Sequence, residues 1–284
     1  MEDRTVLSTL TVMNINDSGL GSLRQAILDA NSNGSTTNTI NFAPALAGKT
    51  ITLTSGELDI TKSVNIVGSS ETISGNNSFR VFKFDSGTNK ISGLIIANAN
   101  STSSSLGGGG ILNNGANLTV SSVTLTHNSA VFGGGLENAD GGTLNVLGST
   151  ISNNSATDSS GGLDNFDLAV ATVSSSSISG NSATNNGGGI GNFVGSTLTV
   201  NGSTISNNSA TNGGGIYNST SAVTVNGSVV AGNTASTEGG GIDNPTGTVT
   251  LNNSVVAGNT APTDPDINGP FTAHHSIVGG VFYP

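Results

Sequence analysis

The acidic residues that could do chemistry in this 284-residue sequence recur at a fixed interval. Glu137 and Asp164 are 27 positions apart, and Asp140 and Asp167 are separated by the same number. Two carboxyl groups held a few ångströms apart can act as acid and base in the hydrolysis of glycosidic bonds. Carboxylate oxygens are also the ligands that calcium prefers. Glu137 and Asp164 are therefore candidate catalytic residues, and all four are candidate calcium ligands.

The interval belongs to an internal repeat of about 26 residues, which two phrases mark independently. The phrase Gly-Gly-apolar-x-Asn supplies the asparagines Asn113, Asn138, Asn165, Asn192, Asn218 and Asn244. The phrase Asn-(Ser/Thr)-Ala supplies Asn128, Asn154, Asn181, Asn208, Asn233 and Asn259. Between them lie short alternating strings such as Leu118-Thr-Val120, which are strand signals bounded by turns.

A repeat of this length with several short strands and no helix predicts a solenoid. The fold class is all-β: a right-handed, single-stranded parallel β-helix with three strands per coil and about nine coils after Thr50. Equivalent asparagines would then stack as two hydrogen-bonded ladders. The glycine runs would supply positive φ angles at the corners and allow close approach of neighbouring backbones.

The segment from Ser22 to Asn31 is the one convincing helix, and it is predicted to cover the first coil. Its apolar residues follow helical spacing, Ser22 and Gln25 form a capping box, and Gly34 is placed to end it. Residues 1–49 form the N-terminal strand and cap, and residues 50–284 form the coils, as one continuous domain. Phe271, Phe282 and Tyr283 are predicted to cover the last coil. The apolar stripe of the helix consists of Leu23, Ala26, Ile27 and Ala30.

The N-terminal segment also resembles a known family. Asn16-Asp-Ser-Gly-Leu-Gly-Ser-Leu-Arg-Gln-Ala-Ile-Leu-Asp-Ala-Asn31 is similar to the opening of bacterial right-handed β-helix repeat proteins with a CSLREAI-type cap. Gly21 stands where that motif has Cys. The Gly-Gly-Gly-Ile-x-Asn repeats are similar to polymorphic outer-membrane-protein repeats of the pectin-lyase-like fold. The resemblance implies a secreted or cell-surface scaffold with an adhesin-like role.

The charge and composition of the sequence argue against several classes of partner and function. The net charge is −10, and no Lys or Arg follows Lys90, so nucleic acids and anionic membrane surfaces are not expected partners. No apolar run is long enough to span a bilayer, and no cysteine offers a disulfide or a thiolate ligand. The first residues lack the pattern of a signal peptide, so an export signal is expected upstream of this segment.

A polysaccharide lyase or glycoside hydrolase is the alternative function, because enzymes of the pectin-lyase-like fold have these activities. Arg80 and Lys83 are the early candidates for a lyase base, but the favoured interpretation places them on a solvated strand face. The longest connections, Ala99 to Leu106 and Asp158 to Ser160, are short, so any cleft should be shallow. The slot of Glu137 and Asp164 also holds Leu112, Gly191, Tyr217 and Asp243, which favours a solvated outward surface.

The favoured function is therefore a non-catalytic structural or adhesive module, secreted or at the cell surface, that contacts extracellular polysaccharides or surfaces. It needs no cofactor and no metal, with calcium as the alternative if the acidic residues converge. The chain is expected to be a monomeric rod or part of a longer one.

Overall fold

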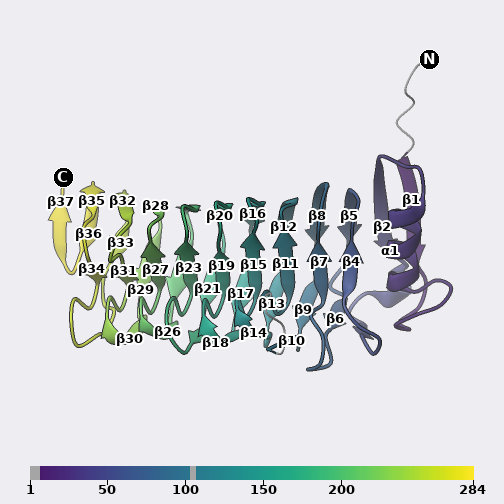
Figure 1. Ribbon diagram of the computed structural model, residues 1–284, viewed down its shortest axis with the longest axis horizontal. Coiled ribbons are helices and arrows are strands. Elements are labelled where there is room, and N and C mark those ends of the chain that lie inside the picture. The colour runs from purple at the N-terminus through teal and green to yellow at the C-terminus, as the bar shows by residue number, and fades with distance from the viewer. Residues whose placement is uncertain (1–6, 103–106) are drawn as a thin grey trace, which may run out of the picture.

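The chain forms a parallel β-solenoid of about 10 turns with about 26 residues per turn, which confirms the predicted fold class. The structure is a computed structural model that describes residues 7–102 and 107–284. Its turns stack along one long axis, with the helix α1 at the N-terminal end and β37 at the other (Figure 1). The strand β2, which precedes Thr50, already pairs in parallel with β5, so stacking begins before the predicted first coil.

Four sheets run along the solenoid in the described part of the chain. Sheet 1 consists of β1 (Leu7–Val12), β2 (Thr37–Phe42), β5 (Val64–Val67), β8 (Thr88–Ser92), β12 (Asn117–Ser121), β16 (Thr143–Leu147), β20 (Val170–Ser174), β24 (Thr197–Asn201), β28 (Ala222–Asn226), β32 (Thr248–Asn252) and β35 (Thr272–His274). Sheet 2 consists of β3 (Thr50–Thr52), β6 (Thr72–Ser74), β9 (Ile95–Ala97), β13 (Thr124–Thr126), β17 (Thr150–Ser152), β21 (Ser177–Ser179), β25 (Thr204–Ser206), β29 (Val229–Ala231), β33 (Val255–Val256), β36 (Ser276–Val278) and β37 (Val281–Tyr283).

Sheet 3 carries the candidate site, and sheet 4 lies just before it in each central turn. Sheet 3 consists of β4 (Leu58–Ile60), β7 (Phe82–Phe84), β11 (Ile111–Asn114), β15 (Leu136–Ala139), β19 (Leu163–Asn165), β23 (Ile190–Phe193), β27 (Ile216–Ser219), β31 (Ile242–Asp243) and β34 (Ile267–Asn268). Sheet 4 consists of β10 (Asn100–Ser101), β14 (Ser129–Phe132), β18 (Ser155–Ser159), β22 (Ser182–Ala183), β26 (Ser209–Asn212) and β30 (Thr234–Glu238). The prediction of three strands per coil was therefore wrong for the six turns that contribute to sheet 4, where a fourth strand begins, from β14 onward at the phrase Asn-(Ser/Thr)-Ala.

Inward side chains form continuous apolar columns, because the strands of successive turns pair in register. In sheet 3 the column holds one fully buried aliphatic side chain in each of six successive turns: Ile111, Leu136, Leu163, Ile190, Ile216 and Ile242. Each side chain packs on its equivalents above and below, at the strand spacing of about 4.8 Å. The core thus extends along the whole solenoid, and each sheet contributes a single layer of side chains to it.

Both predicted asparagine ladders are present. In the ladder from Asn113 to Asn244, each Nδ2 donates to Oδ1 of the next asparagine at 2.6–2.9 Å. In the ladder from Asn128 to Asn259 the same bonds measure 2.9–3.0 Å. This second ladder ends on Asp266, whose Oδ1 accepts from Asn259 Nδ2 at 2.9 Å. The amides satisfy buried backbone groups at the corners, which is why no apolar residue replaces them.

A serine ladder, which the sequence analysis missed, runs through another corner. From Ser176 onward each Oγ accepts the backbone N–H of the equivalent serine one turn earlier, at 3.0–3.2 Å, and Ser149 Oγ accepts that of Val123. The signal in the sequence was a serine at the repeat interval, often after glycine as at Gly202-Ser203, and in the structure that preceding residue has a positive φ. The ladder consists of Ser149, Ser176, Ser203, Ser228, Ser254 and Ser276.

The helix α1 (Leu23–Ser32) covers the N-terminal end, and its predicted apolar stripe is buried. Ser22 is the N-cap, and its side chain accepts from the Gln25 backbone N–H. The Gln25 side chain bonds to Asp29 instead of closing the predicted capping box. The helix ends at Ser32 with Asn33 as its C-cap, and Gly34 follows directly, next to the predicted end but without the positive φ of a glycine cap. A 3-10 turn, η1 (Pro44–Leu46), follows β2.

An ion pair fastens the helix to the first turns. Arg24 Nη2 lies 2.7 Å from Asp17 Oδ1, and the same guanidinium donates to the carbonyls of Gly56 and Glu57. Burial alone would raise the pKa of Asp17, but hydrogen bonds from Ser55 and Arg24 outweigh it and hold the pKa below its usual value.

At the C-terminal end, β37 turns back and pairs antiparallel with β36. Phe271 and Tyr283 meet edge to face at 5.6 Å and pack on the core. Phe282 is 60% exposed, so its predicted place in the cover was wrong: it faces away from the core in the antiparallel pair.

Candidate functional site

The outward residues of sheet 3 stand one above another in successive turns. Glu137 pairs in register with Leu112 on one side and Asp164 on the other. Glu137 is only 6% exposed and Asp164 only 3%, so the interpretation of this slot as solvated surface was wrong. The full row of residues paired in register at this position is Asp59, Lys83, Leu112, Glu137, Asp164, Gly191, Tyr217, Asp243 and Asn268.

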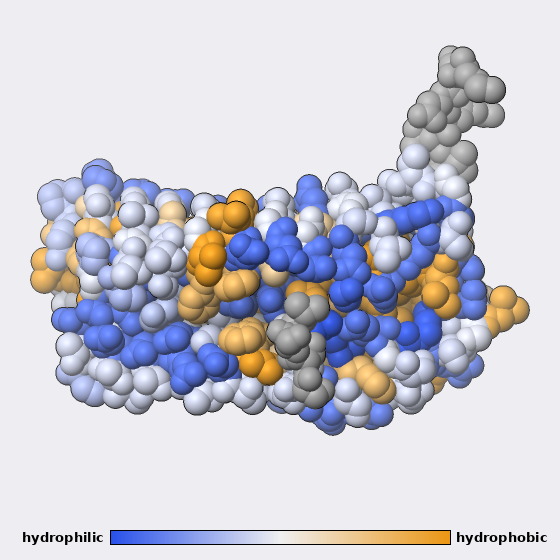
Figure 2. All heavy atoms as spheres, viewed as in Figure 1, coloured by the Kyte–Doolittle hydropathy of each residue, from blue (hydrophilic) through white to orange (hydrophobic). Residues whose placement is uncertain are grey.

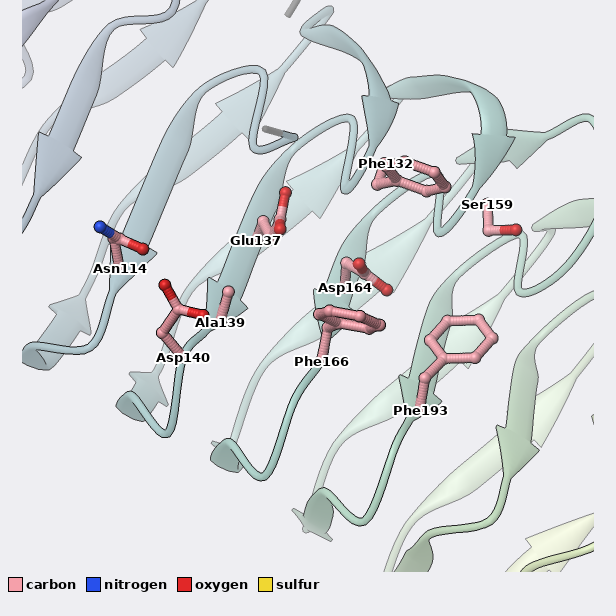
Figure 3. Close-up of a pocket in the computed structure, with 9 residues that line it drawn as sticks. All are labelled: Asn114, Phe132, Glu137, Ala139, Asp140, Ser159, Asp164, Phe166 and Phe193. Atoms are coloured by element: carbon pink, nitrogen blue, oxygen red, sulfur yellow. The ribbon is translucent and has the colours of Figure 1, made fainter. Parts of the chain in front are cut away.

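The two carboxyl groups lie in a cavity of about 310 Å³, which we call the sheet-3 pocket. In Figure 3, Asp164 lies between Phe132 and Phe166, and Glu137 lies beside it on the neighbouring strand, near Ala139 and Asp140. Among the described lining residues, three aromatic side chains form walls of the pocket, and residues 103–106 of the connection from Ala99 to Leu106 lie outside the described residues. The lining residues are Asn114, Phe132, Glu137, Ala139, Asp140, Ser159, Asp164, Phe166 and Phe193.

Local sequence changes in two adjacent turns shape one end of the pocket. Gly191 occupies the slot after Asp164, and a Cβ there would collide with Ser160 Oγ and the Phe193 ring. Ser160 has φ of +66°, in a position that glycine holds in the neighbouring turns, and its Oγ donates to Asp164 Oδ1 at 2.6 Å. A serine in the left-handed region costs about 1–3 kcal/mol, and such strain concentrates at functional sites.

Burial raises the pKa of Glu137 to about 8, and the neighbouring Asp164 charge acts in the same direction. The charge of Arg80 and a hydrogen bond from the Gly107 backbone to this carboxyl group oppose this rise. Glu137 Oε2 is buried and has no hydrogen-bond partner among the described residues. A buried oxygen without a partner is costly, and in a native structure it calls for an explanation.

The pKa values of other acidic residues in this row are raised as well. Burial raises the pKa of Asp164 to about 7, against the hydrogen bond from Ser160, while Asp158 adds to the rise. Burial also raises the pKa of Asp243 to about 6, against the hydrogen bond that Asn268 Nδ2 donates at 2.8 Å. Glu137 and Asp164 therefore titrate as a coupled pair, in which the protonation of one carboxyl group affects that of the other.

The pocket brings together three of the four acidic residues singled out from the sequence: Glu137, Asp140 and Asp164. Asp167 occupies a corner with φ of +56° and is not among the lining residues. Calcium needs six to eight oxygen ligands. Within residues 7–102 and 107–284, no group of three or more acidic or histidine side chains is placed to hold a metal ion.

The basic residues considered for lyase chemistry lie outside the lining. Arg80 is 6% exposed, with Nη1 2.6 Å from Glu57 Oε2 and other donors on the carbonyls of Gly107 and Gly108. Lys83 Nζ lies 2.7 Å from Asp85 Oδ2. The interpretation of Arg80 as part of a solvated face was therefore wrong: it is a buried side chain that holds the turn before β11.

The aromatic walls were missed, although the sequence carries a signal for them. Phe166 and Phe193 each directly follow a ladder asparagine, where the preceding turns have Asn114 and Ala139. The equivalent position in other turns holds a small or polar residue. Two aromatic residues there in successive turns therefore indicate that the surface becomes apolar at this point. Phe166 is 40% exposed. Apolar side chains accordingly gather midway along the rod in Figure 2, over the turns that carry β15 to β23.

No family model and no curated protein sequence matches this chain. In the described part of the chain, no helix is both long and apolar enough to cross a membrane.

Proposed function

We propose that this protein is a non-catalytic module of the extracellular space or cell surface, which binds glycans through the sheet-3 pocket. The observation that carries the proposal is the pairing of half-buried phenylalanine rings with buried carboxyl groups in one cavity. A sugar presents apolar C–H faces and polar edges, which match aromatic walls around a few polar groups. The regular coils on either side make the rest of the solenoid a rigid support.

We also propose that the solenoid is right-handed and belongs with the β-helix proteins that have a CSLREAI-type cap. The residues that resemble this motif form α1 and the turn before it. Gly21, in the place of the motif's Cys, has φ of +77°, which glycine adopts without strain. The extracellular location depends on this resemblance. Labelling of intact source cells by an antibody against the purified protein tests it, and labelling only after lysis would reject it.

Glycan binding predicts a specific effect of the pocket aromatics. In a screen of the purified full chain against extracellular oligosaccharides, followed by calorimetry, Phe166→Ala should weaken binding of a captured glycan about tenfold, or about 1.4 kcal/mol. Phe282→Ala removes an exposed ring far from the pocket and should leave affinity unchanged. The proposal fails if no glycan binds, or if both variants bind like the parent.

A glycoside hydrolase is the second candidate, because a carboxyl group with a raised pKa beside another carboxyl group is what a general acid requires. Under the leading proposal, incubation with polysaccharides should release no new reducing ends. Release that Glu137→Gln abolishes and Asp167→Asn leaves intact would establish hydrolysis instead. Asp167 is the matched control, since it is acidic and lies close by in the chain but not in the pocket lining.

A further inference from the structure

The sheet-3 pocket has an excess of acidic groups that the surrounding chain does not balance. Glu137, Asp140 and Asp164 line it, and no Lys or Arg is among its described lining residues. The charge of Arg80 lowers the pKa of Glu137, but this guanidinium is bonded to Glu57 and to the carbonyls of Gly107 and Gly108. Buried carboxyl groups without a cationic partner hold their protons, and a cation bound beside them favours the ionised form, so the chemistry that complements this site is a positive charge from a ligand.

An unpartnered oxygen points to the same conclusion independently of the acidic cluster. Glu137 is more than nine-tenths buried, its side chain lies in the cavity, and Oε2 accepts no hydrogen bond from the described residues (Figure 3). Asp164 differs, because Ser160 already donates to its Oδ1. A ligand N–H directed at Glu137 Oε2 would satisfy this oxygen with a charge-assisted hydrogen bond.

The walls of the pocket favour an organic cation over a metal ion. Phe132, Phe166 and Phe193 offer ring carbons, which are not metal ligands, but their π faces attract an ammonium group within about 6 Å of a ring centre. At the rim, Asn114 and Asp140 add polar groups, and Ser159 adds a buried hydroxyl to the lining. Such a rim suits a polyhydroxylated ligand better than a lysine side chain, whose stem has no polar group to bind there.

We propose that the sheet-3 pocket selects glycans that carry a free amino group, that is, 2-amino-2-deoxy sugar residues. The ammonium group lies between Glu137 and Asp164, the ring packs against Phe166 and Phe193, and the hydroxyl groups bind at the rim. N-acetylation removes the positive charge and adds bulk, so it should oppose binding. This inference rests on the glycan-binding function proposed above and names its ligand class.

The test compares two oligosaccharides of the same length and linkage, one of glucosamine and one of N-acetylglucosamine, by titration calorimetry with the full chain. The parent protein should bind the glucosamine oligomer at least about tenfold more tightly, the factor that corresponds to about 1.4 kcal/mol. Glu137→Gln and Asp164→Asn keep the side-chain shape and remove the charge. Each should reduce that preference, and the double variant should bind the two oligomers within about twofold of each other.

Separate outcomes distinguish this inference from the proposed function. Equal or tighter binding of the acetylated oligomer by the parent overturns the selection of amino sugars and leaves glycan binding standing. A preference for the glucosamine oligomer that survives in the double variant also overturns it. Binding of Nα-acetyl-lysine methylamide as tight as that of the glucosamine oligomer would assign the site to a lysine side chain. If neither these oligomers nor any glycan in the wider screen binds, both proposals fall.

Discussion

Replacing Gly188 with Ala should destabilise the solenoid by about 3 kcal/mol or more, because two backbone carbonyls leave no room for a side chain. A Cβ at this position would lie 2.5 Å from the carbonyl oxygens of both Ser209 and Gly214. Both atoms belong to the next turn, whose strands are fixed by ladder hydrogen bonds, so the turn cannot move away without breaking its own pairing. Urea denaturation followed by circular dichroism measures the loss.

The matched control is Gly202→Ser, at a glycine with a different role. Gly202 has φ of +52° and nothing within 4 Å of a Cβ built on it. Ser122 and Ser175 hold the same slot in earlier turns with φ of 54° and 49°. The control should therefore cost about 1 kcal/mol, the low end of the range for serine in the left-handed region, because this corner already accommodates serine in two other turns. Equal losses in the two variants would show that backbone conformation, not the close approach of neighbouring turns, makes the glycines necessary.

The repeat made most of this fold predictable from the sequence. Successive turns repeat the same strands, ladder asparagines and glycine corners. A strand or corner predicted for one turn can therefore be checked against the equivalent positions of the next. The asparagine ladders were predicted for this reason, since an amide retained at both marker positions needs a buried hydrogen-bonding role. The fourth strand and the serine ladder were missed because serine and threonine are common throughout the chain, so their positions stand out little from the background.

The candidate site was harder to predict, because it depends on departures from the repeat. Outward positions are normally solvated, and the sequence does not reveal that aromatic residues from neighbouring turns enclose Glu137 and Asp164. The enclosure needs Phe132 before the glycine corner, Phe166 and Phe193 after the ladder asparagine, and the absence of a side chain at Gly191. Each change is small within its own turn, and only the stacking register combines them.

The stability of the protein should fall as the pH rises from about 4.5 to about 8, because Glu137 and Asp164 hold their protons more tightly in the folded state. Their pKa values are about 8 and about 7, against ordinary values of 4.5 and 3.8. Between the unfolded and folded values, the unfolded chain has released a proton that the folded chain still binds. Each such group lowers the free energy of unfolding by up to about 1.4 kcal/mol per pH unit, so the pair should cost several kcal/mol over this range.

The double variant Glu137→Gln with Asp164→Asn should remove most of this slope in urea denaturation curves, and the part below about pH 6 that Asp243 adds through its own raised pKa should remain. The control Asp140→Asn with Asp167→Asn changes two acidic residues that are exposed or half-buried, and it should keep the slope. Asp17 acts with the opposite sign, since its lowered pKa contributes stability that is lost below about pH 4, outside the window. A double variant with the same slope as the parent would show that the two carboxyl groups ionise freely in the folded state. The pocket would then be open to water, and its unpaired charge would no longer require a cationic ligand.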